Sequence, residues 1–297
     1  MGIRKMRAPV LAGILGAFLG ITVAPAFEWP QLNVNAASFA SGFAQLRGGI
    51  LSGSLVFGAP QEVFASDPGV VLVVLREVDD GSDSFHSPLG NAVIIDHNDD
   101  MVTVYGNLRA INLIPGVAEV DGGHFLGVAG FSGWQPVVPS QTAQGLEFQM
   151  IDTRQSQVIN PRVLMPHLAD EPVFRIYGLS MDNNHGDLFR LSEAPAFPAG
   201  VYLLYYETDP QHIPYRTIVS VNGTTAETLT YDAITERNGR LTIRGKRYYT
   251  REELYPGGNS MLLGEVPFLR GRNTIRVVVS NINGVEGAGV TYLVENY

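Results

Sequence analysis

The sequence predicts an all-β protein built from two antiparallel β domains. Three observations carry this prediction: short segments rich in β-branched and aromatic residues recur along the chain, Gly, Asn, Asp and Pro separate them, and amphipathic helical periodicity is absent apart from one turn near residues 251–254. The expected strands are residues 70–78, 91–96, 101–105, 146–151, 173–179, 201–207, 217–221, 241–244, 274–280 and 290–294.

A proline-rich connector divides the expected strands into two groups. Residues 160–172 contain three prolines in thirteen positions, which favours a stiff link between separate cores at residues 27–166 and 172–297. In the second group, Asn-Gly pairs predict tight hairpins, so we expect a C-terminal immunoglobulin-like β-sandwich. Asn222-Gly223-Thr224 also matches a glycosylation sequon, but the hairpin turn is the favoured interpretation.

The N-terminus has the pattern of a secretory signal peptide. Arg4, Lys5 and Arg7 precede an apolar run at residues 8–23, and Ala24-Pro25-Ala26 follows as a small-residue cleavage site. The alternative is an uncleaved anchor, but the run is shorter than the roughly 20 residues that a spanning helix needs. We therefore expect residues 1–26 to be removed and the protein to be exported, to the periplasm or alternatively to the outside of the cell, with no membrane span left.

Charge and cysteine content exclude several classes of protein. The formal net charge is −9, and removal of the three basic residues in positions 1–26 changes it to −9 − 3 = −12. Such an acidic chain is not expected to bind nucleic acid or anionic lipid. Because the chain has no cysteine, it has no disulfide scaffold and no thiol nucleophile.

Ordered motifs in the first domain resemble a known enzyme family. They include Ser41-Gly42-Phe43, Gly58-Ala59-Pro60, GNAVIIDH at residues 90–97, VTVYG at residues 102–106 and the strand around Leu146 and Phe148. In order and spacing, residues 27–166 resemble the lysostaphin-type, or LytM-like, zinc endopeptidases that cut peptidoglycan. The resemblance implies a LytM-like antiparallel β domain, the duplicated hybrid motif, with a narrow substrate groove.

The resemblance also locates the positions where that family places its catalytic residues. The family holds zinc with the two side chains of a His-x-x-x-Asp motif, which correspond to Ser52 and Val56, and with the second histidine of a His-x-His pair, which corresponds to Glu147. The first histidine of that pair corresponds to Gly145, and the histidine of a Tyr-x-His motif corresponds to Asn107.

These replacements remove the chemistry that zinc catalysis needs. Zinc takes nitrogen, sulfur or carboxylate ligands and keeps one open position for water, and of the five positions only Glu147 offers such a ligand. We therefore expect no zinc, no other cofactor and no catalytic residue. We also expect Ser52, Val56, Asn107, Gly145 and Glu147 to form an exposed, mostly uncharged groove floor for binding, in which Gly145→Trp would leave stability nearly unchanged.

Other chemistry-bearing residues have simpler interpretations. One set of histidines and aspartates offers an alternative, a metal site moved away from the family's positions: His86, His97, His124, Asp96, Asp99 and Asp100. A hydrogen-bonded strand-end position is favoured for His97, and a solvated turn is favoured over a calcium loop for residues 79–83, which lack the terminal Glu. A sugar-stacking platform is an alternative interpretation for one set of aromatic residues: Trp134, Tyr202, Tyr205, Tyr206, Tyr248 and Tyr249. Core packing is the favoured interpretation for the tyrosines.

The resulting functional hypothesis is a non-catalytic LytM-like protein of the cell envelope. It would regulate or scaffold peptidoglycan hydrolysis by contacting an envelope protein such as a peptidoglycan hydrolase. Two alternatives stay open: a peptidoglycan-binding module that uses the emptied groove, and an active metallo-endopeptidase with a relocated metal site.

Overall fold

The computed structural model describes residues 27–77, 87–133, 145–183, 188–193, 196–207, 213–257 and 259–297. The expected signal peptide and residues 79–83 lie outside these ranges, as do His86, Trp134, His185 and His212. Within them, no helix has the length and apolarity needed to cross a bilayer.

The all-β prediction is confirmed. In the described ranges the chain forms strands β1–β24, one four-residue helix, α1 (Arg251–Leu254), and two 3₁₀ turns, η1 (Ala36–Ser38) and η2 (Pro161–Val163). The pairings are antiparallel except for the short contact between β15 and β24 and one isolated bridge. Gly and Asn at left-handed backbone positions close the hairpins, as at Asn222 (φ 52°) with Gly223 (φ 81°), which confirms the turn interpretation of that pair.

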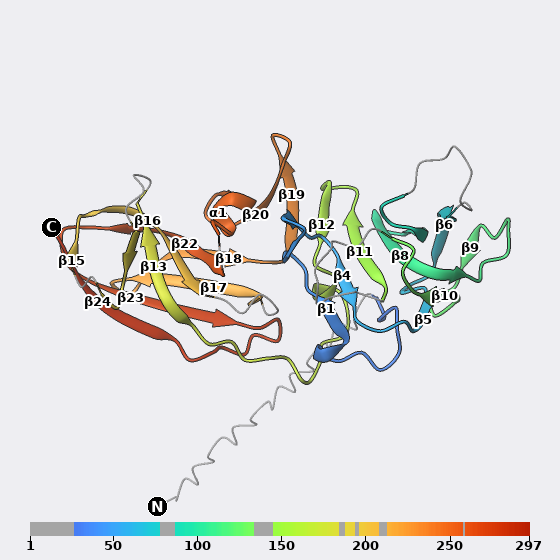
Figure 1. Ribbon diagram of the computed structural model, residues 1–297, viewed down its shortest axis with the longest axis horizontal. Helices are drawn as coiled ribbons and strands as arrows, with labels where there is room; N and C mark the ends of the chain where they lie inside the picture. Colours follow the sequence, from blue (N-terminus) through green and yellow to red (C-terminus); the bar gives the residue numbers. More distant parts are fainter. Residues whose placement is uncertain are drawn as a thin grey trace, which may run out of the picture.

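One large sheet dominates the first half of the chain (Figure 1). Its path follows the order β21 (Tyr248–Thr250), β20 (Arg240–Arg244), β19 (Ala233–Arg237), β12 (Gln157–Ile159), β11 (Glu147–Asp152), β8 (Met101–Ile111), β7 (Asn91–His97), β6 (Gly69–Leu75) and β9 (Glu119–Val120). Four strands branch from it: β1 (Phe39–Ser41), β4 (Leu55–Phe57), β5 (Glu62–Phe64) and β10 (Phe125–Ala129). A separate hairpin joins β2 (Leu46–Arg47) to β3 (Ile50–Leu51).

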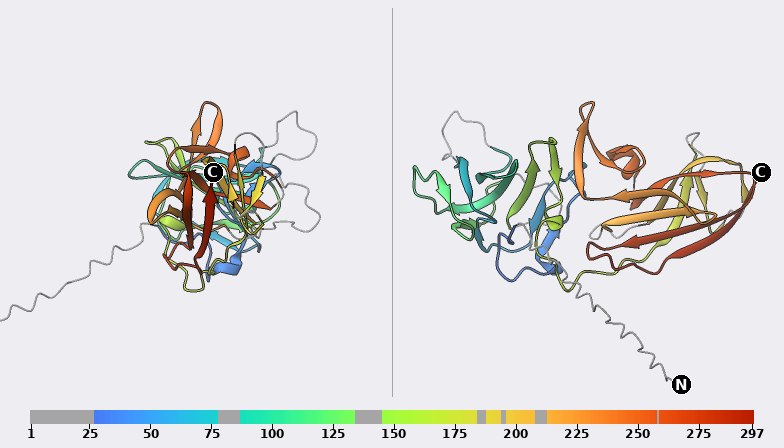
Figure 2. Two further views of the ribbon diagram at one scale, coloured as in Figure 1. Left: turned by 90° about the vertical axis from the view of Figure 1, so that its left-hand side faces the viewer. Right: turned by 180° about the vertical axis from the view of Figure 1, so that it is seen from behind.

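The second half of the chain forms two further sheets, which Figure 2 shows from behind. The four-stranded sheet has the order β14 (Leu188–Arg190), β13 (Tyr177–Asp182), β16 (Gly200–Glu207) and β22 (Ser260–Phe268). The five-stranded sheet has the order β15 (Ala196–Phe197), β24 (Val290–Asn296), β23 (Gly271–Ser280), β17 (Arg216–Val221) and β18 (Thr224–Thr230). β22 contacts β17 and β18, and Tyr202, Tyr205 and Tyr206 are buried, which confirms core packing for these tyrosines.

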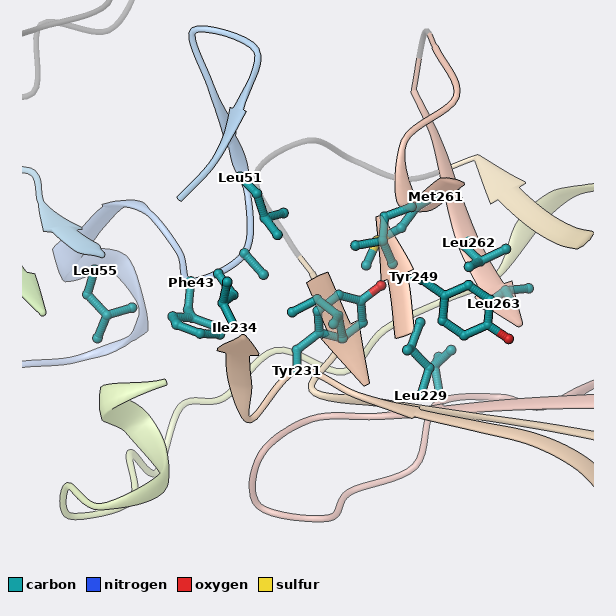
Figure 3. Close-up of a cluster of buried hydrophobic side chains, with 14 of the residues drawn as sticks. Phe43, Leu51, Leu55, Leu229, Tyr231, Ile234, Tyr249, Met261, Leu262 and Leu263 are labelled. Atoms are coloured by element: carbon teal, nitrogen blue, oxygen red, sulfur yellow. The ribbon is translucent and has the colours of Figure 1, made fainter. Parts of the chain in front are cut away.

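The large sheet continues across the expected domain boundary. β12 of the first half pairs with β19 of the second half, with Val158 opposite Ile234. Figure 3 shows Phe43 and Leu51 in one cluster with Tyr231 and Ile234, and these side chains are buried. The expectation of separate cores is therefore wrong, because the β19–β21 strands of the second half extend the first sheet and share its apolar interior.

The proline-rich segment is packed against both halves. Trp29 Nε1 donates to the carbonyl of Pro166 at 3.0 Å, and Asn283 Nδ2 donates to the carbonyl of Leu168 at 2.7 Å. Met165 and Leu168 are buried. The segment is thus packed into the folded structure, which differs from the stiff connector between separate cores that its prolines predict.

Candidate functional site

Of the five positions located by the resemblance, Val56, Asn107 and Glu147 lie on the adjacent strands β4, β8 and β11, Gly145 lies two residues before β11, and Ser52 directly follows β3. Glu147 is opposite Val56 across the β4–β11 pair and opposite Gly106 across the β8–β11 pair. Asn107 follows Gly106 and donates from Nδ2 to the carbonyl of Gly145 at 2.7 Å. Positions assigned from separate motifs are thereby neighbours in space.

The Glu147 carboxylate is already bound by side chains of the same chain. Arg47 Nη1 lies 2.9 Å from Oε1, and the Ser54 hydroxyl donates to the same oxygen at 2.7 Å. Gln149 Nε2 then donates to Ser54 Oγ at 2.7 Å. The side chains of Arg47 and Glu147 are 13% and 14% exposed, so the ion pair is largely shielded from water.

Asn107 ties three backbone segments together. Nδ2 also donates to the carbonyl of Gly130 at 2.6 Å, and Oδ1 accepts from the Gly133 amide at 2.9 Å. Its φ of 60° lies in the left-handed region, which asparagine tolerates better than most residues. Both amide hydrogens are in use, so the side chain serves as a structural crosslink where the family has an acid–base histidine.

Gly145 lies where two backbones approach too closely for a side chain. A Cβ atom built there would lie 2.0 Å from the carbonyl oxygen of Phe57. The Phe57 amide donates to the carbonyl of Leu146 at 2.9 Å and holds β4 against this segment. A histidine at this position would require the two strands to separate.

The expected groove floor is not open. Ser52, Val56 and Asn107 are 8%, 1% and 1% exposed, and Gly145 is also buried. Ser52 is held by backbone hydrogen bonds to Ala44 and Gln45. The prediction of an exposed, uncharged floor is therefore wrong, because strand pairing and the Arg47–Glu147 ion pair fill it.

The tyrosine of the family's Tyr-x-His motif is a core residue here. Tyr105 is fully buried, and its hydroxyl accepts a 2.8 Å hydrogen bond from the Ser66 amide. Burial raises the pKa of this phenol, and the Ser66 hydrogen bond opposes the rise only partly. Tyr105 therefore stays neutral and structural.

His97 has the hydrogen-bonded position expected for it. Since a carbonyl only accepts, Nδ1 donates to Pro68 O at 2.8 Å, and Nε2 lies 2.7 Å from Thr103 Oγ1. His124 is exposed, and Asp99 and Asp100 form the left-handed turn between β7 and β8. In the described ranges, no three His, Asp or Glu side chains gather closely enough to hold a metal.

A large hollow lies elsewhere, at the junction of the two halves. Its volume is about 700 Å³, and Leu55, Arg162, Phe174, Tyr215 and Tyr231 are among the residues that line it. Leu55 is the strand neighbour of Val56 and pairs with Phe148. Because successive side chains of a strand point to opposite faces, Leu55 points away from the face of β4 that carries Val56. The hollow is therefore separate from the five positions.

Arg47, Ser54 and Gln149 complete the hydrogen-bonded cluster around Glu147, and none of them is a site residue expected from the sequence. One sequence signal points to Arg47, which is the only basic residue between positions 8 and 75. A carboxylate on a half-buried strand needs a cation or several donors. That requirement identifies Arg47 as the partner of Glu147 but gives no indication of Ser54.

Comparison with known proteins places the chain in a family. An uncharacterized protein of Treponema pallidum (strain Nichols) is 32% identical over 143 residues, which cover 94% of that protein and 44% of this chain. The chain belongs to the same family as that protein. A protein-family model matches residues 173–294, from the end of the proline-rich segment onward.

Solved structures show weaker similarity. The NMR solution structure of lysostaphin is 15% identical, with 86% of this chain and 96% of that chain covered and a TM-score of 0.33. The SpoIIIAH and SpoIIQ complex matches at 17% identity over 46% of this chain and 96% of that chain, with a TM-score of 0.34. The SpoIIQ–SpoIIIAH pore forming complex matches at 20% identity over 40% of this chain and 68% of that chain, with a TM-score of 0.30. Similarities of this size carry no functional information.

Proposed function

We propose that the chain is a non-catalytic LytM-like protein of the cell envelope that regulates or scaffolds peptidoglycan hydrolysis by binding another protein. One observation carries the proposal: the positions assigned to zinc and to acid–base chemistry lie close together, and the polar side chains of Glu147 and Asn107 are committed to internal contacts. Glu147 is paired with Arg47, and Asn107 is bonded to Gly130, Gly133 and Gly145. A preserved arrangement with internally satisfied side chains supports a scaffold that has lost its reaction.

The alternative of a peptidoglycan-binding groove has less support. A stem peptide or sugar would have to displace the Arg47–Glu147 ion pair or separate β4 from Gly145. Both events expose buried polar groups and are costly. Binding through another surface avoids that cost.

Metal content and wall digestion test the proposal together. Protein purified without chelators should contain less than a stoichiometric amount of zinc, and it should release no fragments from purified sacculi. Lysostaphin serves as the positive control for digestion. About one zinc per chain together with released wall fragments would contradict the proposal and favour a relocated metal site.

A second experiment separates the regulator from the peptidoglycan-binding module. Sedimentation with purified sacculi should leave the protein in the supernatant, whereas crosslinking in cells should join it to an envelope hydrolase. Strong co-sedimentation without a crosslinked protein partner would favour the binding module.

A further inference from the structure

A basic segment interrupts this acidic chain. Residues 237–251 hold six of its twenty lysines and arginines and no acidic residue: Arg237, Arg240, Arg244, Lys246, Arg247 and Arg251. The segment contains the tip of the β19–β20 hairpin, β20 and β21. In Figures 1 and 2 this hairpin rises above the body of the molecule near its middle.

Two of these six side chains form ion pairs within the chain, and the side chains of Arg237, Arg240, Arg244 and Lys246 form none among the described residues. Arg247 pairs with Glu253 and Glu265, and Arg251 pairs with Glu252. Arg237, Arg240 and Arg244 are exposed, and none has an acidic partner among the residues that the structure describes. The charge on these three guanidinium groups is therefore available to a ligand.

Strand register puts the three arginines on one face. Arg237 is directly opposite Arg240, and Arg244 is directly opposite Tyr248. Because alternate residues of a strand share a face, Arg240 and Arg244 also point the same way. The opposite face carries Ile234, Ile243 and Tyr249, which are buried in the core.

Tyr248 fixes one of the arginines in place. The Arg237 guanidinium lies 4.6 Å from the centroid of the Tyr248 ring, and Nη2 donates to the Tyr248 hydroxyl at 3.0 Å. This contact crosses the middle strand above Thr242, which is only 2% exposed. The guanidinium is thereby preorganised, and its other donors stay free.

The arrangement of Arg237 and Arg240 has a cost for folding. Arg237 and Arg240 are like charges directly opposite each other, with Cβ atoms about 5 Å apart, a pairing that destabilises a hairpin. A local conflict of this kind is typical of surfaces that serve binding.

From this geometry we propose that the outer face of β19–β21 is a docking surface for a carboxylate-rich, extended segment of a partner protein. Arg240 and Arg244 are four residues apart, about 14 Å along the strand, and an extended peptide presents side chains on one side about every 7 Å. Guanidinium groups bind carboxylates through paired hydrogen bonds. The face presents no exposed apolar side chain for insertion into a bilayer, because Leu241 points to the reverse side with its partner Glu236.

This inference rests on the proposed function, since it names the face and the chemistry by which the protein would hold its partner. Fluorescently labelled poly-L-glutamate is the probe, titrated into the full-length chain at low and physiological salt. The double variant R240Q/R244Q should weaken binding about fivefold or more, and higher salt should weaken binding of the unmodified chain. The matched control R270Q/R276Q removes two exposed arginines that also have no acidic partner, and it should change affinity less than about twofold.

Three outcomes would overturn the inference. They are no binding of poly-L-glutamate, equal weakening by the control variant, and tighter binding of inorganic polyphosphate or phosphatidylglycerol vesicles with the same dependence on Arg240 and Arg244. The last result would assign the face to phosphate or to a membrane. Zinc content and wall digestion are measured independently, so a failure of the proposed function is distinguishable from a failure of this inference.

Discussion

The Tyr255 hydroxyl donates a 2.9 Å hydrogen bond to the backbone carbonyl of Ala44, which lies 211 residues earlier in the chain. Ala44 is fully buried and has a left-handed φ of 63°, and its amide donates to the carbonyl of Ser52. A residue that follows α1 in the second half therefore anchors the strained turn next to Ser52, to which the resemblance to LytM-like peptidases assigns a zinc-ligand position. The two halves are coupled at this point as well as through β12 and β19.

Tyr255→Phe should lower the free energy of unfolding by about 1–2 kcal/mol, because it leaves the buried Ala44 carbonyl without its donor. Urea denaturation followed by tryptophan fluorescence measures the change. Tyr297→Phe is the control, since Tyr297 is 68% exposed and should change stability by less than about 0.5 kcal/mol. Equal effects of the two variants would show that the Ala44 contact contributes nothing.

Limited proteolysis should not cut first within residues 161–172. Backbone carbonyls of this segment accept hydrogen bonds from Trp29, Asn281 and Asn283, and proteases cut where the backbone is free. We expect early fragments to end outside this segment, as mapped by mass spectrometry. Two stable fragments that meet within residues 161–172 would instead support independent domains.

The strands were predictable and the junction was not. Residues 91–96 and 201–207 show the composition and spacing of strands, and the structure has β7 and β16 there within one residue. By contrast, the pairing of Val158 with Ile234 depends on a register between segments far apart in sequence, and prolines in the intervening segment suggest separation. Local pattern specifies an element but does not specify its partner.

The same limit applies to the candidate site. Motif spacing located positions that prove to be neighbours at Val56, Asn107, Gly145 and Glu147, because β4 and β8 both pair with β11. Whether the floor was open depended on the close approach of Gly145 to Phe57 and on Arg47 reaching Glu147. Neither contact has a signature in local sequence beyond the isolated positive charge of Arg47.

Gly145→Ala should destabilise the protein by about 2–3 kcal/mol, because the added Cβ would lie 2.0 Å from the Phe57 carbonyl and would force the backbones apart. Gly200→Ala is the matched control, since the nearest atom to its Cβ would lie at an ordinary contact distance of 3.6 Å. Thermal and urea unfolding of both variants decide the matter. A Gly145 variant as stable as the control would show that this position has room for a ligand after all.

Acid should remove the stabilising contribution of Glu253. Partial burial raises the pKa of this carboxyl, but hydrogen bonds from Arg247 and from the Thr250 amide outweigh burial and hold the pKa below its ordinary value of 4.5. A depressed carboxyl pKa stabilises the fold above the unfolded value and loses that effect as the pH falls through the folded value. Glu253→Gln should therefore be less stable than the unmodified chain at pH 7, and the difference should shrink below about pH 4.5. A stability difference between the two proteins that is constant from pH 7 to pH 3 would contradict this assignment. Glu193→Gln is the control, because Glu193 lies in an exposed ion pair.

Introducing the zinc ligands of the LytM-like peptidases tests whether these positions have the geometry of a zinc centre. The triple variant Ser52→His, Val56→Asp, Glu147→His places a histidine and a carboxylate directly opposite each other on β4 and β11, and the second histidine lies four residues before the carboxylate. Cβ atoms of opposite residues are about 5 Å apart, which lets two side chains reach one ion.

We expect the triple variant to bind about one zinc per chain and to gain thermal stability when zinc is added, because a ligand that binds only the folded state stabilises it. The double variant Ser52→His, Glu147→His keeps Val56 and should bind zinc at least about tenfold more weakly, since it lacks one ligand. A chelator competition titration measures both affinities. Equal affinities, or no binding by a folded triple variant, would show that these positions are neighbours without the geometry of the zinc enzymes.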